Sequence, residues 1–147
     1  MRAIAIALTT IFIAAHGNVL ADCGDVPEGA ETFVRDHKVY HFNGDPPSRV
    51  QDELALWKTK IGSTCFLLRT IGPNYHQCEV SSVVSAVRGN ELEFKKGSCT
   101  LTFQKGARDV KLIASPGWER IGRGGVCPKN SCGMYGEIES GTFRAKR

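Results

Sequence analysis

Two closely spaced histidines are the residues that come nearest to a metal site in this chain. His37 and His41 lie four positions apart with Asp36 beside them, a spacing that would place both imidazoles on one face of a helix, as a zinc site requires. The surrounding residues, Val39 to Phe42, instead have the character of an extended strand, and no third ligand is suggested nearby. We therefore predict no metal and no other cofactor.

The same histidines permit a second chemistry, general acid and base catalysis in a secreted nuclease-like hydrolase. The candidate groups are His37, His41 and His76, and Arg69 and Glu79 are near the last of these in the sequence. Such catalysis needs two titratable groups flanking a phosphate and a cation above it, and nothing in the spacing brings these side chains together. The sequence also lacks a nucleophile elbow and a phosphate-binding loop. We predict no catalytic residues, with the hydrolase as the alternative.

Aromatic and arginine side chains in irregular segments indicate a binding surface instead. Trp118 lies with Arg120 and Arg123 in a stretch rich in Gly and Pro, residues 115–132, that is long for a connection. Trp and Arg are over-represented at protein contact surfaces, so these three residues, together with Tyr75 in another turn, are the predicted binding residues. The alternative for Trp118 is that it folds back as a lid over the open end of the sheet.

The N-terminus predicts export. A basic start is followed by an apolar run over residues 3–15 and by small or aliphatic residues at 19–21, the pattern of a signal peptide covering residues 1–21. A membrane anchor is one alternative, but the run is too short to span a bilayer. A lipoprotein is another, but Asp22 rather than a small residue precedes Cys23. We expect a periplasmic or secreted protein without a stable membrane anchor.

The cysteines agree with export. All six follow the expected cleavage site, which predicts three disulfides in an oxidising compartment, although their pairing cannot be deduced from spacing. The last two could bridge to other parts of the sheet or to each other. The remaining length, residues 22–147, fits one disulfide-stabilised β-rich domain. The cysteines are Cys23, Cys65, Cys78, Cys99, Cys127 and Cys132.

Charge is unevenly distributed along the mature chain. Residues 22–87 carry six Lys and Arg against nine Asp and Glu, a net charge of −3, whereas residues 88–147 carry twelve against six, a net charge of +6. A basic second half is suited to an acidic surface. The plainer interpretation is a set of solvated turns, because the charges are scattered rather than gathered in one block. No nucleic acid partner is expected.

One helix is predicted, over residues 48–61. Ser48 and Gln51 fit the two ends of a capping box, and Gly62 is a natural stop. A second, weaker helical pattern covers residues 29–35. The apolar residues of the main helix follow at helical spacing and should lie across a sheet; they are Val50, Leu54, Trp57 and Ile61.

From Thr64 onward the pattern alternates and turn residues recur at short intervals, as in an antiparallel meander. Gly89-Asn90 predicts a tight hairpin, and Ser81-Ser82 suggests a bulge. We predict a mainly β fold of the α+β class: a disulfide-stapled meander of five to seven strands, curved toward a small barrel, with one packed helix. The expected strands lie around residues 65–71, 77–88, 91–95, 99–103 and 110–112.

Short motifs in the second half of the chain resemble those of a known group. The segment Gly97 to Phe103, the cysteines Cys127 and Cys132, and the segment Gly141 to Arg144 are similar to the C-terminal pattern of small exported proteobacterial β-domains of the periplasmic lysozyme-inhibitor type. This resemblance implies a loop that enters the active-site cleft of a cell-wall lytic enzyme. The second inhibitory motif of that group is absent, and the second half of this chain is basic where an inhibitor of a basic lysozyme should be acidic.

These observations together favour an exported, non-enzymatic binding protein. Its expected partner is another protein, and the resemblance implies an inhibitor or immunity-type partner of a cell-envelope lytic enzyme. The histidine-dependent hydrolase and a structural envelope protein are the two alternatives from other functional classes.

Overall fold

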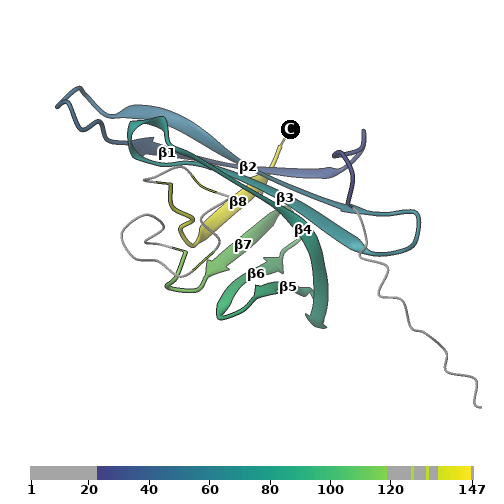
Figure 1. Ribbon diagram of the computed structural model, residues 1–147. Helices are drawn as coiled ribbons and strands as arrows, with labels where there is room; N and C mark the ends of the chain where they lie inside the picture. Colours follow the sequence, from purple (N-terminus) through teal and green to yellow (C-terminus); the bar gives the residue numbers. More distant parts are fainter. Residues whose placement is uncertain (1–22, 119–126, 128–131, 133–135, 147) are drawn as a thin grey trace, which may run out of the picture.

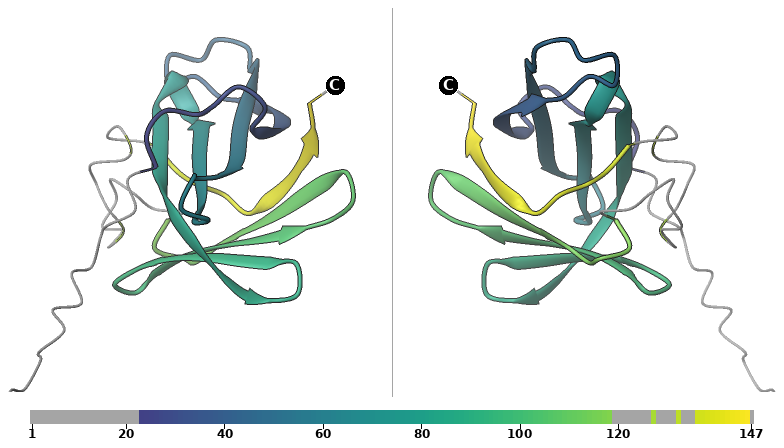
Figure 2. Two further views of the ribbon diagram at one scale, coloured as in Figure 1. Left: turned by 90° about the vertical axis from the view of Figure 1, so that its right-hand side faces the viewer. Right: turned by 90° about the vertical axis from the view of Figure 1, so that its left-hand side faces the viewer.

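The computed structural model describes residues 23–118, Cys127, Cys132 and residues 136–146. Within this part of the chain, eight antiparallel strands follow one another in sequence order around a closed barrel, in which β8 pairs with both β7 and β1 (Figures 1 and 2). The strands are β1 (Glu31–Val39), β2 (Ser48–Lys58), β3 (Thr64–Ile71), β4 (Gln77–Arg88), β5 (Glu91–Lys96), β6 (Cys99–Lys105), β7 (Asp109–Ala114) and β8 (Gly141–Ala145).

The barrel interior is filled by the side chains that alternate inward along each strand. In β7, Val110, Leu112 and Ala114 are buried while the residues between them are exposed, as the two-residue period of a strand dictates. The Phe66 ring packs 4.9 Å from the Phe103 ring, centroid to centroid, at the centre of this core. The predicted barrel is therefore confirmed, with eight strands in place of the expected five to seven.

The predicted helix over residues 48–61 is wrong, because this segment forms β2 and the turn after it. Leu54 and Leu56 point into the barrel core, as a strand requires. Ala55 and Trp57, on the opposite face of β2, are also buried, in a second apolar cluster. Burial on both faces removes the clean alternation of a half-exposed strand and leaves apolar residues at a spacing that imitates a helix.

The second cluster exists because the segment before β1 covers the outer face of the barrel. Ala30 packs against it, and the disulfide between Cys23 and Cys65 attaches this segment to β3. The predicted helical turn over residues 29–35 is also wrong, since β1 begins at Glu31. The described part of the chain contains no helix with the length and apolar character needed to cross a membrane.

The strand prediction from residue 64 onward is accurate to within a few residues. Gly89 adopts a positive φ of 58° in the hairpin between β4 and β5, as the primed turn predicted there requires. The bulge expected at Ser81-Ser82 is misplaced: pairing there is regular, and the shift in register lies between Ala86 and Arg88.

Several connections gather at one end of the barrel, which we call the capped end. These are the β1–β2 loop, the 3-10 turn η1 (Pro73–Tyr75) and the described parts of the long β7–β8 connection, all on the left in Figure 1. Trp118 and Ile138 of that connection are 0% exposed and belong to the main core. These two described residues of the connection therefore help to close this end of the barrel.

Three disulfides hold these connections in place. Cys78–Cys132 and Cys99–Cys127 attach the β7–β8 connection to β4 and β6, and no free cysteine remains. The predicted number of bridges is confirmed, and it indicates an oxidising, extracytoplasmic compartment. Because the bridges span 28 to 54 residues, each is expected to contribute about 3–4 kcal/mol.

Peptide mapping of the oxidised protein tests this pairing. Proteolysis without reduction, followed by mass spectrometry, should recover cross-linked peptides joining Cys23 to Cys65, Cys78 to Cys132 and Cys99 to Cys127. A sample reduced and alkylated before proteolysis serves as the control and should yield only linear peptides. A bridge between Cys127 and Cys132, which the sequence leaves open, would contradict the arrangement of the capped end.

Candidate functional site

A completely buried carboxylate, that of Asp52, lies at the capped end of the barrel. Asp52 Oδ2 accepts hydrogen bonds from Arg35 Nε at 3.0 Å and Arg35 Nη2 at 2.6 Å, and the two residues are directly paired across β1 and β2. Asp52 Oδ1 accepts from the Ile71 amide at 2.8 Å and lies 3.0 Å from His37 Nε2. Hydrogen bonds from three residues and the charge of Arg35 offset the cost of removing the carboxylate from water.

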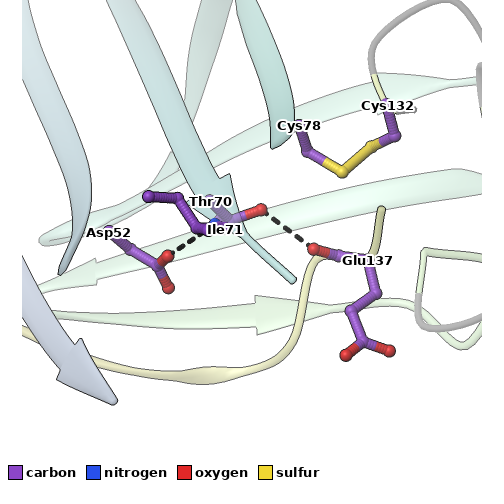
Figure 3. Close-up of a disulfide and its surroundings, with 6 residues drawn as sticks. All are labelled: Asp52, Thr70, Ile71, Cys78, Cys132 and Glu137. Atoms are coloured by element: carbon purple, nitrogen blue, oxygen red, sulfur yellow. Dashed lines mark hydrogen bonds between the residues drawn. A yellow bond between two sulfur atoms is a disulfide. The ribbon is translucent and has the colours of Figure 1, made fainter. Parts of the chain in front are cut away.

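The same network reaches the segment that precedes β8. Arg35 Nη1 donates to the backbone oxygens of Glu139 and Ser140, at 3.1 and 3.3 Å. The Thr70 hydroxyl donates to the Glu137 oxygen at 2.9 Å, close to the Cys78–Cys132 disulfide (Figure 3). The Asp52 network therefore joins three strands to the closing segment.

Gly141 allows the closing segment to approach this network. A Cβ atom at this position would collide with the guanidinium of Arg35, so any side chain there would displace Arg35 or the start of β8. The requirement is steric: Gly141 is needed for close backbone approach at the start of the last strand.

A polar pocket of about 210 Å³ opens beside the Asp52 network. The His37 side chain lines it and is 28% exposed. Since a carboxylate can only accept, His37 Nε2 carries the hydrogen toward Asp52, which leaves Nδ1 as an acceptor in the neutral ring. The other lining residues include Arg35, Lys38, Tyr40, Pro73, Glu137 and Glu139.

Three exposed aromatic residues lie in the β1–β2 loop and in η1 at the capped end, and we call them the aromatic rim. One of them, Tyr40, lines the pocket. Tyr40 and Phe42, in the β1–β2 loop, are 67% and 57% exposed, and Tyr75 of η1 is 53% exposed. The ring of His41 packs against Tyr75 with a centroid distance of 5.1 Å. Two segments that are distant in sequence thus present their aromatic residues at one end of the molecule.

Hydrogen bonds hold the two halves of the rim together. The Asn74 amide donates to the Tyr40 oxygen at 3.0 Å, and Asn74 Oδ1 accepts from the Phe42 amide at 3.1 Å. Asn74 and Tyr75 both adopt positive φ, at 55° and 61°, a conformation that is uncommon outside glycine and is found disproportionately at functional sites. Hydrogen bonds of Asn74 therefore join the two segments that carry the rim.

The structure distributes the predicted binding residues differently from expectation. Tyr75 lies in the rim, exposed as predicted. Trp118 is 0% exposed, which corrects its inclusion in the surface: its large apolar ring system packs near Phe94, with centroids 6.5 Å apart, and closes the core as in the lid alternative. Arg120 and Arg123 lie outside the described residues.

Sequence reasoning missed two of the three rim residues. Tyr40 and Phe42 belong to the run whose composition predicts a short strand, whereas β1 ends at Val39 and this run enters the loop. The one available signal was position, since Tyr40 and Phe42 directly precede the turn cluster of residues 43–48, where a strand has to end.

Of the three histidines in the hydrolase alternative, only His37 lines the pocket beside Asp52. His37 contacts Asp52, and His41 Nε2 lies 2.9 Å from the Ser48 hydroxyl. Neither His41 nor His76 lines the pocket beside His37. The described residues contain no group of three or more His, Cys, Asp or Glu suited to a metal ion.

Arg69 and Glu79, the remaining residues of that alternative, form an ion pair on the outer face of the barrel. Arg69 Nε donates to Glu79 at 2.8 Å, and this hydrogen bond is the main cause that raises the pKa of Arg69 above its ordinary value. Because arginine is already charged at every accessible pH, this shift adds no pH dependence.

Replacing the buried carboxylate tests its importance for stability. Asp52→Asn removes the charge that balances Arg35 and should lower the free energy of unfolding by about 3 kcal/mol or more, measured by urea denaturation. Asp36→Asn is the matched control, because Asp36 is exposed and, within the described residues, its side chain bonds to Gln51 alone. It should change stability by less than about 0.5 kcal/mol. Equal effects of the two substitutions would contradict the assigned importance of Asp52.

Comparisons with protein-family models, curated proteins and solved structures give no match to this chain. The likeness to periplasmic lysozyme inhibitors therefore stays a prediction that rests on short motifs. The candidate site is defined by its own geometry: a polar pocket built on Asp52 and an exposed aromatic rim at its edge.

Proposed function

We propose that this chain is an exported, non-enzymatic binding protein that acts as an inhibitor or immunity-type partner of a cell-envelope lytic enzyme, in the periplasm or outside the cell. Its binding surface is the aromatic rim of Tyr40, Phe42 and Tyr75. The observation that carries this proposal is that all three side chains are more than half exposed on loops that are tied to each other.

Exposed aromatic side chains are the best-supported signal of a contact surface here. Aromatic residues are enriched in the centres of protein interfaces, where burial of their large rings contributes much of the binding energy. The hydrogen bonds of Asn74 hold the rim in one conformation before any partner arrives, which lowers the entropy lost on binding. The three disulfides fit a partner in an oxidising compartment.

The hydrolase alternative has one observation in its favour. The contact of His37 with Asp52 resembles the arrangement in which a carboxylate orients a catalytic base. We do not prefer it, because the same carboxylate is bonded to Arg35 and to the Ile71 amide, as expected of a group that holds three strands together. No second titratable histidine lines this pocket among the described residues.

An inhibition assay with rim variants tests the proposal. Purified oxidised protein should slow the digestion of cell walls by at least one member of a panel of muramidases, lytic transglycosylases and amidases. Tyr40→Ser combined with Phe42→Ser should raise the inhibition constant at least about tenfold, which corresponds to a loss of about 1.4 kcal/mol, less than a single aromatic hot spot can contribute. Ile61→Ser is the matched control, because Ile61 is 71% exposed in the β2–β3 turn at the other end of the barrel.

Two results would count against the proposal. Inhibition that survives the rim substitutions but is lost with Ile61→Ser would move the binding surface away from the capped end. Cleavage of RNA or peptidoglycan by the protein itself, abolished by His37→Ala, would replace the binding function with the hydrolase.

A further inference from the structure

The outer face of the β1–β2 hairpin pairs its charges except near the tip. Glu53 lies 4.0 Å from Arg69 Nη1 and 3.5 Å from Lys146 Nζ. Asp36 accepts a hydrogen bond from Gln51 at 3.0 Å. Charged groups on most of this face therefore have partners within the described chain.

Lys38 and Arg49 are the exception. They face each other directly across β1 and β2, both are exposed, and neither has an ion pair or side-chain hydrogen bond with any residue that the structure describes. Like charges at directly opposed positions repel and destabilise a strand pair. The only carboxylate of the loop between them, Asp45, bonds to Asn43.

This cation pair adjoins the aromatic rim. Lys38 is two residues before Tyr40, and both residues line the pocket. The hairpin that bears the pair extends beyond the other strands at the capped end, where a partner can reach it (Figure 1). The two cations and two of the three rim residues, Tyr40 and Phe42, therefore lie on the same projecting hairpin.

We propose that Lys38 and Arg49 recognise carboxylate groups on an acidic segment of the protein partner, while the aromatic rim packs on apolar residues of the same segment. This inference rests on the proposed function and adds the chemistry of the partner. The repulsion between the two cations is a local cost that an acidic partner relieves, because its carboxylates neutralise both charges on binding. Charge complementarity selects a partner that is acidic at the contact, unlike a basic lysozyme.

Lys38→Glu separates a binding role from a structural one. It replaces the opposed cations by a cross-strand pair of opposite charge, so the urea midpoint of unfolding should rise while binding weakens. Lys95→Glu is the matched control, because Lys95 is exposed on β5 and faces the uncharged Thr100, and it should leave the midpoint nearly unchanged. A lower midpoint for Lys38→Glu would show that Lys38 stabilises the fold and would overturn the inference.

Binding is measured with a synthetic peptide of glutamates around one leucine, added to isotope-labelled protein and followed by NMR. The peptide should shift amide signals of residues 37–50, and the effect should shrink as salt screens the charges. The double variant Lys38→Glu with Arg49→Glu should weaken peptide binding at least about tenfold, because the new carboxylates on the protein would repel the glutamates of the peptide. A control peptide with glutamine in place of glutamate should not bind. The double variant Lys95→Glu with Lys96→Glu is the matched protein control, because it changes the net charge by the same amount at another place.

The outcomes distinguish this inference from the proposed function. Loss of enzyme inhibition in the rim variants, with full inhibition in Lys38→Glu with Arg49→Glu, would leave the function in place and remove the acidic partner. Equal binding of the glutamate and glutamine peptides would also overturn the inference. A third result would overturn it as well: the protein sediments with phosphatidylglycerol vesicles, does not sediment with phosphatidylcholine vesicles, and shows no response to the peptide. The surface would then bind an anionic membrane.

Discussion

The buried carboxylate of Asp52 is the contact on which the capped end depends. A charge that is completely removed from water persists only when donors surround it, and here those donors come from β1 and β3. Arg35 also links this carboxylate to the segment before β8, because it donates hydrogen bonds to backbone oxygens there. One side chain of β2 thus fixes how neighbouring strands and the closing segment meet, in the part of the barrel where its apolar filling gives way to polar groups.

The candidate surface follows from this arrangement. The strand that supplies Arg35 and His37 continues into the loop of Tyr40, and the strand that supplies the Ile71 amide continues into the turn of Tyr75. Asn74 then joins the two extensions directly. A rim that displays aromatic rings to water therefore stands on strands that a buried, charged hydrogen-bond network joins, an arrangement suited to a preorganised contact surface.

The sequence was most informative where one face of a strand is solvated, as in β6 and β7, and where glycine marks a tight turn, as at Gly89. It misled at β2, because packing against the Cys23–Cys65 segment buries the second face and no local pattern reports a contact between residues that far apart. The same limit applies to the site. Residues with chemical potential, such as His37 and Tyr75, were recognised singly, but Asp52 gave no signal, since its importance comes from donors on neighbouring strands.

The most direct test of this account is amide hydrogen exchange in Asp52→Asn, under conditions where the variant stays folded. If the Asp52 network holds the rim, the amides of Ile71, Phe42 and Asn74 should exchange faster than in the native protein. The Gly62 amide, bonded to the Thr59 oxygen at the other end of the barrel, should change much less. Unchanged exchange at Phe42 and Asn74, or equal acceleration at both ends of the barrel, would contradict the claim that this carboxylate organises the capped end.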